Sequence, residues 1–309
     1  MNYNATAISV FIVISQLTSA IASDILETSD LPEKILAKLS QMESEVAKNS
    51  YTVSCRHTSR LMFEPQVRPT TSDFVAHKTS AQSEWVIGTG DSRCYTCRGT
   101  ASNVRSDGSE TDTTRTEKSV FNGLTGEGRR IQKTRSADGE IHVDDRTGTS
   151  FGGGCPLQLA GYVAGTRTSD LLEGTRVRVI DELHLDGYTV AVLQTDPKQI
   201  EGERASYYSE IWVDTQRWLT VKRKFFHRED ASRPFKPTMQ INCEQFVLVS
   251  ERLWLPSHIH LWSWNSDAED NVRKGHESHL AYEGWEIVPE LPENQFALEF
   301  TVDDPNSDK

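Results

Sequence analysis

The stretch from residue 206 to 264 constrains the fold most, because it predicts long strands that follow one another with hardly a break. Along the first run, Ile211 and Val213 fall on one face and Glu210 and Trp212 on the other. Successive side chains of a strand point to opposite faces, so this alternation predicts a sheet with one buried face and one partly wet face. The predicted strands are Ser206–Asp214, Trp218–Arg228, and Met239–Ser250 continuing into Leu253–Trp264. The turn residues 214–217 predict that the first two of these strands form an antiparallel hairpin.

The rest of the chain adds helices and further strands. Apolar residues recur every three or four positions in Leu31–Val46, which predicts an amphipathic helix. A strand, Tyr51–His57, follows at once, so this helix must fold back near the sheet. Residues 102–118 are rich in Ser, Thr, Asp and Arg and form either a mobile loop or polar, outward-facing strands. After a glycine-rich hinge at 151–154, Pro156–Val163 predicts a short helix that would suit a lid.

Length and charge limit the classes of partner. The chain has 309 residues, which suits one large β domain or two small ones. Its formal net charge of −12 argues against nucleic acid as a partner, because phosphate binding needs Lys and Arg. The same charge argues against docking on an anionic lipid surface, but it leaves open an apolar ligand in a neutral cavity.

The N-terminus predicts export. An apolar stretch, Ala5–Leu17, precedes Ala20, Ile21 and Ala22, which have the small-x-small form of a signal-peptide cleavage site. Residues 1–22 are therefore expected to be removed, so that the mature chain starts at Ser23 in a periplasmic or secreted location. The apolar core is too short to span a bilayer, which needs about 20 residues, so an integral membrane protein is not expected. A buried N-terminal helix or a membrane anchor is the alternative.

The mature chain is expected to be a single β-rich domain over residues 23–303, with a frayed tail at 304–309. In an exported protein, its five cysteines allow up to two disulfides, whose pairing the sequence leaves open. These residues are Cys55, Cys94, Cys97, Cys155 and Cys243. Cys94 and Cys97 have redox-motif spacing, but they lie in a predicted strand and not at a helix N-terminus. A structural role is therefore expected for this pair.

The order of elements resembles a known family. Residues 210–215 (Glu-Ile-Trp-Val-Asp-Thr) precede a basic-aromatic strand, residues 254–256 (Trp-Leu-Pro) follow, and residues 294–300 close the domain with a Phe-containing segment. Together with the amphipathic helix that precedes the first strand, this pattern resembles the LolA-like superfamily of periplasmic lipoprotein carriers. The resemblance implies a mainly β (α+β) fold, in which a long antiparallel meander curves into a half-open barrel. It also implies helices that cover the concave face and acyl chains held there.

On this basis the chain is expected to be a non-enzymatic binding protein for an apolar or acylated ligand, with no cofactor. A curved sheet with few helices leaves an apolar concavity, which is the default ligand site. The aromatic residues expected to line it are Trp85, Tyr95, Phe121, Tyr208, Trp212, Trp218, Phe225 and Trp254. The alternative is that these aromatic side chains fill a closed core.

Two other functions compete. His258 and His260 share a strand face, and His276, Glu277 and His279 could return beside them after a loop. Imidazole and carboxylate ligands at such positions would suit Zn²⁺, so a metal-dependent hydrolase using His258, His260, His276 and His279 is the runner-up. The third possibility is a structural envelope protein that binds a protein partner by its sheet edge.

Overall fold

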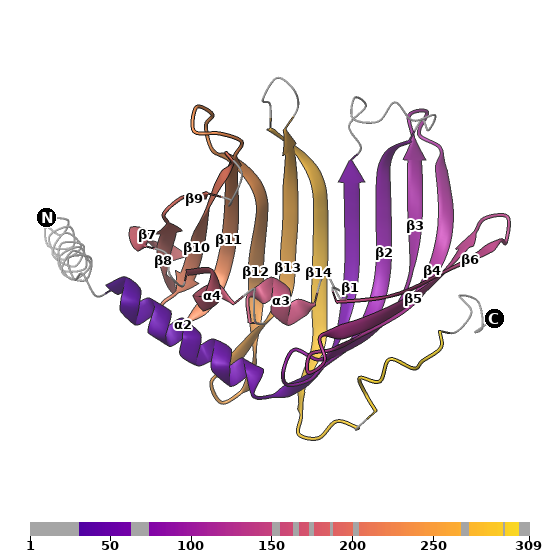
Figure 1. Cartoon of the computed structure of the whole chain (residues 1–309), viewed down its shortest axis with the longest axis horizontal. Helices are drawn as coiled ribbons and strands as arrows, with labels where there is room; N and C mark the ends of the chain where they lie inside the picture. The colour runs from indigo at the N-terminus through magenta and orange to yellow at the C-terminus, as the bar shows by residue number, and fades with distance from the viewer. Residues whose placement is uncertain are drawn as a thin grey trace, which may run out of the picture.

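A single antiparallel sheet dominates the computed structural model, which describes residues 31–62, 74–149, 155–162, 167–172, 176–185, 188–199, 204–266, 272–292 and 294–302. Fourteen strands form this sheet in the order β6-β5-β4-β3-β2-β1-β14-β13-β12-β11-β10-β8-β7, with β9 paired to β10. The sheet is a meander in two halves. The first half is β1–β6 and the second is β7–β14, and the two join where β1 pairs with β14 (Figure 1).

The strands of the first half are β1 (Ser50–Met62), β2 (Phe74–Ile87), β3 (Arg93–Arg105), β4 (Glu110–Asn122), β5 (Glu127–Ser136) and β6 (Ile141–Gly148). Those of the second half are β7 (Val177–Leu185), β8 (Tyr188–Thr195), β9 (Lys198–Gln199), β10 (Ser206–Asp214), β11 (Leu219–Arg228), β12 (Lys236–Ser250), β13 (Leu253–Ser266) and β14 (Val272–Val288).

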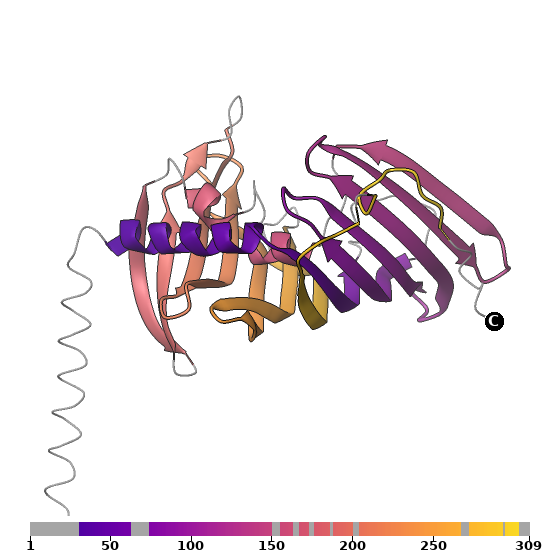
Figure 2. The same cartoon turned by 90° about the horizontal axis from the view of Figure 1, so that it is seen from below.

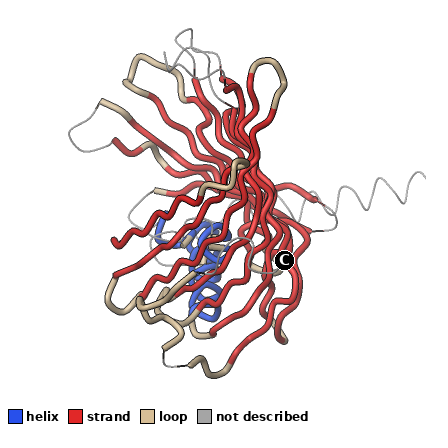
Figure 3. Tube along the Cα trace, turned by 90° about the vertical axis from the view of Figure 1, so that its right-hand side faces the viewer, coloured by secondary structure: helices blue, strands red, loops and turns tan. Residues whose placement is uncertain are grey.

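Three helices lie on one face of the sheet, which we call the inner face, and the opposite face is the outer face. They are α2 (Leu31–Ala47), α3 (Pro156–Ala160) and α4 (Thr168–Leu172). Figures 1 and 2 show α2 running across the second half of the sheet, with the two short helices beside it. In Figure 3 the strands twist strongly around these helices. No helix of the described ranges is both long and apolar enough to cross a membrane.

The inner face carries two apolar clusters. The apolar stripe of α2 buries Ile35 and Leu39 against Leu193, Ile211 and Val213 of the second half. A larger cluster surrounds α3 and the β1–β14 junction. Its residues include Val53, Trp85, Leu157, Leu255 and Ile259. The helices therefore cover the inner face of the second half. They reach the first half at the end of α2, where Val46 packs beside Tyr51, and at α3.

Buried polar contacts fix the helices in place. Glu43 of α2 accepts hydrogen bonds from the backbone N–H, at 3.1 Å, and from the hydroxyl of Ser169 in α4. Burial raises the pKa of the Glu43 carboxyl, partly opposed by these bonds. Arg223 of β11 donates to the carbonyl of Leu159, so a cation satisfies the carbonyl end of α3. Gly161 ends α3 with a φ of 85°, a left-handed conformation that glycine adopts at little cost.

The C-terminal segment, described at 291–292 and 294–302, has no strand there and crosses the strands of the first half (Figure 2). Its Phe300 ring lies 5.0 Å from the Lys118 ammonium group, which is on the outer face of β4. Arg129 of β5 donates to the carbonyl of Leu298 at 3.0 Å. The Phe296 ring lies where a side chain at Gly88 would be, since a Cβ there would approach it to 2.6 Å. Val120 and Cys94, which face outward on β4 and β3, are buried, and Cys94 is hydrogen-bonded to Gln295 of this segment.

The fold class expected from the sequence is confirmed, as a mainly β, open antiparallel sheet with one long N-terminal helix and short helices. The hairpin between β10 and β11 forms as predicted, with buried Asp214 accepting from the N–H groups of Gln216 and Arg217 at 2.9 and 3.0 Å. Residues 102–118 form polar strands, not a loop. The signal peptide, the hinge at 151–154 and the tail from 304 lie outside the described residues.

The cysteines do not form disulfides: all five lie within the described residues and each is a free thiol. Cys94 and Cys97 are three residues apart on β3, so their side chains point to opposite faces of the sheet. They cannot bond to each other, because a disulfide needs the two Cβ atoms to face one another.

We expect Leu39→Ala in α2 to lower the free energy of unfolding by about 2–5 kcal/mol, because the deletion leaves a cavity in a fully covered cluster. Urea titration followed by circular dichroism measures this change. Lys38→Ala, on the exposed side of the same turn, is the control and should stay within about 0.5 kcal/mol of the parent. Equal losses in the two variants would contradict the packing of α2 on the sheet.

Candidate functional site

The inner face of the first half is left open where α2 does not reach, and a pocket of about 410 Å³ lies there. Four successive rows of cross-strand neighbours from β14, β1, β2, β3 and β4 form its floor, and α3 closes one end. Its lining residues are Cys55, His57, Ser59, Thr79, Ala81, Ser83, Trp85, Tyr95, Cys97, Gly99, Thr100, Ala101, Arg115, Leu159, Leu261, Ser278 and Leu280. Rows on one face are about 6.8 Å apart, so the floor is roughly 20 Å long.

The end of the pocket next to α3 is apolar. The rings of Trp85 and Tyr95, cross-strand partners on β2 and β3, stack with centroids 4.5 Å apart. Leu159 of α3 completes this end, and Leu280 of β14 adds an apolar side chain two rows further along, beside His57. Because Arg223 holds the carbonyl of Leu159, the position of this wall depends on a buried contact outside the pocket.

A buried ion pair lies beside the stacked rings. Glu117 of β4 is fully buried, and it accepts hydrogen bonds from Arg115 and from the Tyr95 hydroxyl. Burial lowers the pKa of the Arg115 guanidinium, but the Glu117 carboxylate outweighs this effect and raises it overall. Burial and the same carboxylate raise the pKa of Tyr95. Arg115 therefore keeps its positive charge beside the Glu117 carboxyl group.

The other end is polar. His57 of β1 lies 3.4 Å from the Ser278 hydroxyl, which lies 2.9 Å from Nε2 of His276. Burial lowers the pKa of His57, and the nearby His276 and Arg115 add to the effect. Burial also lowers the pKa of His276. This end therefore presents neutral imidazoles and hydroxyls near neutral pH.

This arrangement suits binding better than nucleophilic chemistry. Burial raises the pKa of Cys97, so its thiol stays protonated and is a poor nucleophile. Ser278 and His276 are hydrogen-bonded, but β14 pairs with strands on both sides there. The backbone N–H groups near Ser278 are used in hydrogen bonds to β1 and β13. They are therefore not available to form an oxyanion hole.

The eight aromatic residues expected to line one concavity are spread over five places. Trp85 and Tyr95 lie in the pocket, and Trp218 and Trp254 line a second groove beside α2 of about 560 Å³. Phe225 packs against the larger apolar cluster. Phe121 lies on the inner face, 4.5 Å from the Arg93 guanidinium carbon. Tyr208 and Trp212 lie on the outer face, where Tyr208 stacks on Phe226 and Lys222 lies over Trp212. Ligand binding by these residues stays a prediction.

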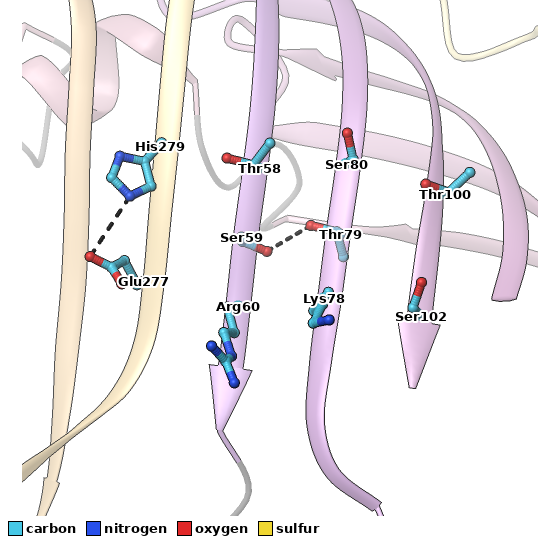
Figure 4. A pocket seen from close by; sticks show the side chains of 10 residues that line it. All are labelled: Thr58, Ser59, Arg60, Lys78, Thr79, Ser80, Thr100, Ser102, Glu277 and His279. Atoms are coloured by element: carbon cyan, nitrogen blue, oxygen red, sulfur yellow. Dashed lines mark hydrogen bonds and ion pairs between the residues drawn. The ribbon is translucent and has the colours of Figure 1, made fainter. Parts of the chain in front are cut away.

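The histidines considered as metal ligands also separate. His260, Glu277 and His279 lie together on the outer face, with their ligand atoms within 4.8 Å of one another. His276 points to the inner face, because it is one residue away from Glu277 on a strand. His258 is on the outer face but one row further along, next to Ser257. Figure 4 shows His279 and Glu277 at the side of a groove whose floor is formed by Thr58, Ser80 and Thr100.

The sequence did not single out Arg115, Glu117, His57 or Ser278. A signal was present for the first two, since opposite charges two residues apart on a strand share a face. Their burial was not visible, because the surrounding residues Thr111–Thr116 are polar.

Comparisons with known proteins add a likeness of fold. No protein-family model matches the chain, and neither does any curated protein. Among solved structures, a LolA superfamily protein from Nitrosomonas europaea is similar at 13% identity and a TM-score of 0.39, covering 85% of this chain and 96% of the other. An outer membrane lipoprotein-sorting protein domain from Vibrio parahaemolyticus has 13% identity and a TM-score of 0.38, covering 86% and 97%. A DUF1329 family protein from Desulfovibrio piger has 9% identity and a TM-score of 0.39, covering 85% and 96%.

The superfamily that the sequence resembles is thus represented among these similar structures. At these identities and TM-scores the likeness concerns the general course of the chain and says nothing of a ligand.

We expect the protein to lose stability as the pH falls below about 6.5, the ordinary pKa of histidine, toward the lowered pKa of folded His57. The unfolded chain binds the proton first in this range, so acid favours unfolding. His57→Gln removes this titration and should lose less stability between about pH 7 and about pH 5. Urea midpoints measure the difference, and His142→Gln, exposed on β6, is the control. A His57→Gln variant as acid-sensitive as the parent would contradict the burial of His57.

Proposed function

We propose that this chain is a non-enzymatic binding protein that holds a lipid-like, amphipathic ligand in the inner-face pocket. The observation that carries the proposal is the polarity of the pocket, which is apolar at the α3 end and hydrogen-bonding at the other. Such a pocket matches a molecule with an apolar tail and a polar head.

The apolar end provides the binding energy. A tail placed between Leu159, Leu280 and the stacked rings of Trp85 and Tyr95 would bury apolar surface at about 25 cal/mol per Å². The stack is already formed, and the fixed α3 wall reduces the ordering that binding would otherwise require. Together these residues form the tail site.

The polar end provides orientation. Among the described residues, no atom accepts a hydrogen bond from the buried Nε of Arg115. An oxygen of the ligand head group could accept it. His57 in the same cross-strand row and Ser278 in the next row offer further polar atoms. Because Glu117 already balances the charge of Arg115, a neutral or weakly anionic head group fits better than a dianion.

Export belongs to the same proposal. A protein that shelters an apolar tail is useful where such a molecule must cross an aqueous compartment, and residues 1–22 have the form of a signal peptide. We therefore place the protein in the periplasm or outside the cell. We further propose that an envelope protein supplies or receives the ligand. Rapid transfer of the ligand to protein-free vesicles would show that no such partner is needed.

The binding proposal predicts that Ala81→Trp abolishes uptake of a dansyl-labelled undecanoate. Ala81 lies in the middle of the pocket floor, between His57 and Gly99, so an indole there would fill the space. Gln82→Trp adds the same ring one residue along β2 on the outer face and should bind like the parent. Dansyl fluorescence on titration measures both, with circular dichroism to confirm folding.

Three results would overturn this proposal. They are uptake that survives in folded Ala81→Trp, equal loss in the two variants, and a parent protein that does not bind the probe.

The export proposal predicts that protein recovered after secretion has lost residues 1–22 and begins at Ser23. Intact-mass measurement decides this, because the loss of the leader changes the mass by a fixed amount. Replacing Ala20 and Ala22 by Lys should block cleavage, since the processing site needs small side chains. A secreted chain that keeps its first 22 residues would contradict the assignment.

A further inference from the structure

We infer that the outer face of the sheet carries a binding site for a divalent transition-metal ion, formed by His260, Glu277 and His279. The three side chains lie on β13 and β14, on the opposite face from the inner pocket. The inference is therefore independent of the proposed ligand and survives if that ligand is wrong.

The register of the sheet places the three side chains together. His260 and His279 are direct cross-strand partners, and Glu277 precedes His279 by two residues on the same face. The two imidazole rings stack with centroids 3.9 Å apart and an interplanar angle of 25°. Because all three side chains extend from paired strands of a continuous sheet, their relative positions are fixed by the backbone ladder.

The spacing of the ligand atoms suits a metal ion. Nε2 of His260 lies 2.9 Å and Nε2 of His279 lies 3.7 Å from the same Glu277 oxygen, Oε1. Zinc binds such atoms at about 2.0–2.2 Å, which puts tetrahedral ligands roughly 3.4 Å apart. The two observed distances bracket that value, so only small side-chain rotations are needed.

The chemistry of the three side chains also suits a metal ion. Both rings present Nε2 to one carboxylate oxygen. A divalent ion uses the lone pairs of both rings and the carboxylate at the same time. Two histidines with one carboxylate are a ligand set that transition metals favour, whereas Mg²⁺ and Ca²⁺ prefer oxygen ligands.

The site is open on one side. The side chain of His279 is 58% exposed and that of Glu277 is 37% exposed, so water can reach the remaining coordination positions. Beside them lies the outer groove of about 440 Å³, lined by the hydroxyls of Thr58, Ser80 and Thr100 (Figure 4). Lys78 and Arg60 also line this groove. Lys78 forms an ion pair with Glu110 at 2.6 Å, and Arg60 is the cross-strand partner of Glu277. Three protein ligands with open positions define a site that can exchange its metal.

Isothermal titration of the mature protein with Zn²⁺ tests the inference. We expect one ion per chain, no binding of Mg²⁺, and binding weakened about a hundredfold or more in His260→Ala and His279→Ala. His258→Ala is the matched control, because it removes an outer-face histidine of the same strand that lies outside the cluster, and it should bind Zn²⁺ like the parent. All three positions are polar and solvent-accessible, so these variants should keep the parent's circular dichroism spectrum.

A second measurement locates the bound ion. The indole of Trp262 lies 4.5 Å from the His260 ring, so Cu²⁺ bound at the site should quench part of the tryptophan fluorescence. Trp262→Phe should remove that part of the quenching and leave the Zn²⁺ affinity unchanged.

Three results would overturn the inference. They are the absence of Zn²⁺ binding by the parent, binding that persists in both His260→Ala and His279→Ala, and equal weakening by His258→Ala. Persistent binding in the two cluster variants would place the ion elsewhere, for example at a cysteine thiol.

Discussion

The antiparallel pairing of β1 with β14 is the contact on which the rest of this structure depends. It joins the N-terminal meander to the C-terminal one, with Ser50 opposite Val288 at one end and Leu61 opposite His276 at the other. Both candidate sites lie along this junction. Without it, His57 and Ser278 would not meet on the inner face, and the floor of the outer groove would lose one of its two sides. One backbone ladder therefore sets the geometry of two sites of different chemistry.

The two-residue period of a strand explains how those sites stay separate. On β14, Ser278 faces the inner pocket, whereas its neighbours Glu277 and His279 face outward. A slip of one residue in the register would exchange the two sets and destroy both sites. At this position of β14 the sheet therefore presents hydrogen-bonding side chains on both of its faces. A substitution that bends β14 should affect both faces together.

Much of the architecture could be predicted from local pattern, because local pattern reports local structure. The stripe of α2 and the alternation of β10 fix which side chains share a face within one element. Sequence spacing also placed His258 and His260 on one face correctly. Sequence spacing does not predict which face of a distant strand joins the same side of the sheet. That depends on the pairing register and on its irregularities, such as the register shift between Trp212 and Val213 in the ladder of β10 and β11. For that reason Trp212 and Trp85, both predicted to line one concavity, lie on opposite faces, and the buried pair of Arg115 and Glu117 went unrecognised in a polar stretch.

The distance in sequence between β1 and β14 has a consequence for the order of folding. The ladder pairs Ser50 with Val288, so the first strand to leave the ribosome waits for nearly the whole chain before its second edge is covered. Contacts this far apart are slow to form, because the loop-closure entropy is lost before the contacts compensate for it. In the interval, β1 presents a bare edge that could pair with another chain. The hydrophilic and charged residues on its outward side, Arg56, Thr58 and Arg60, would make such pairing less favourable while the chain is incomplete.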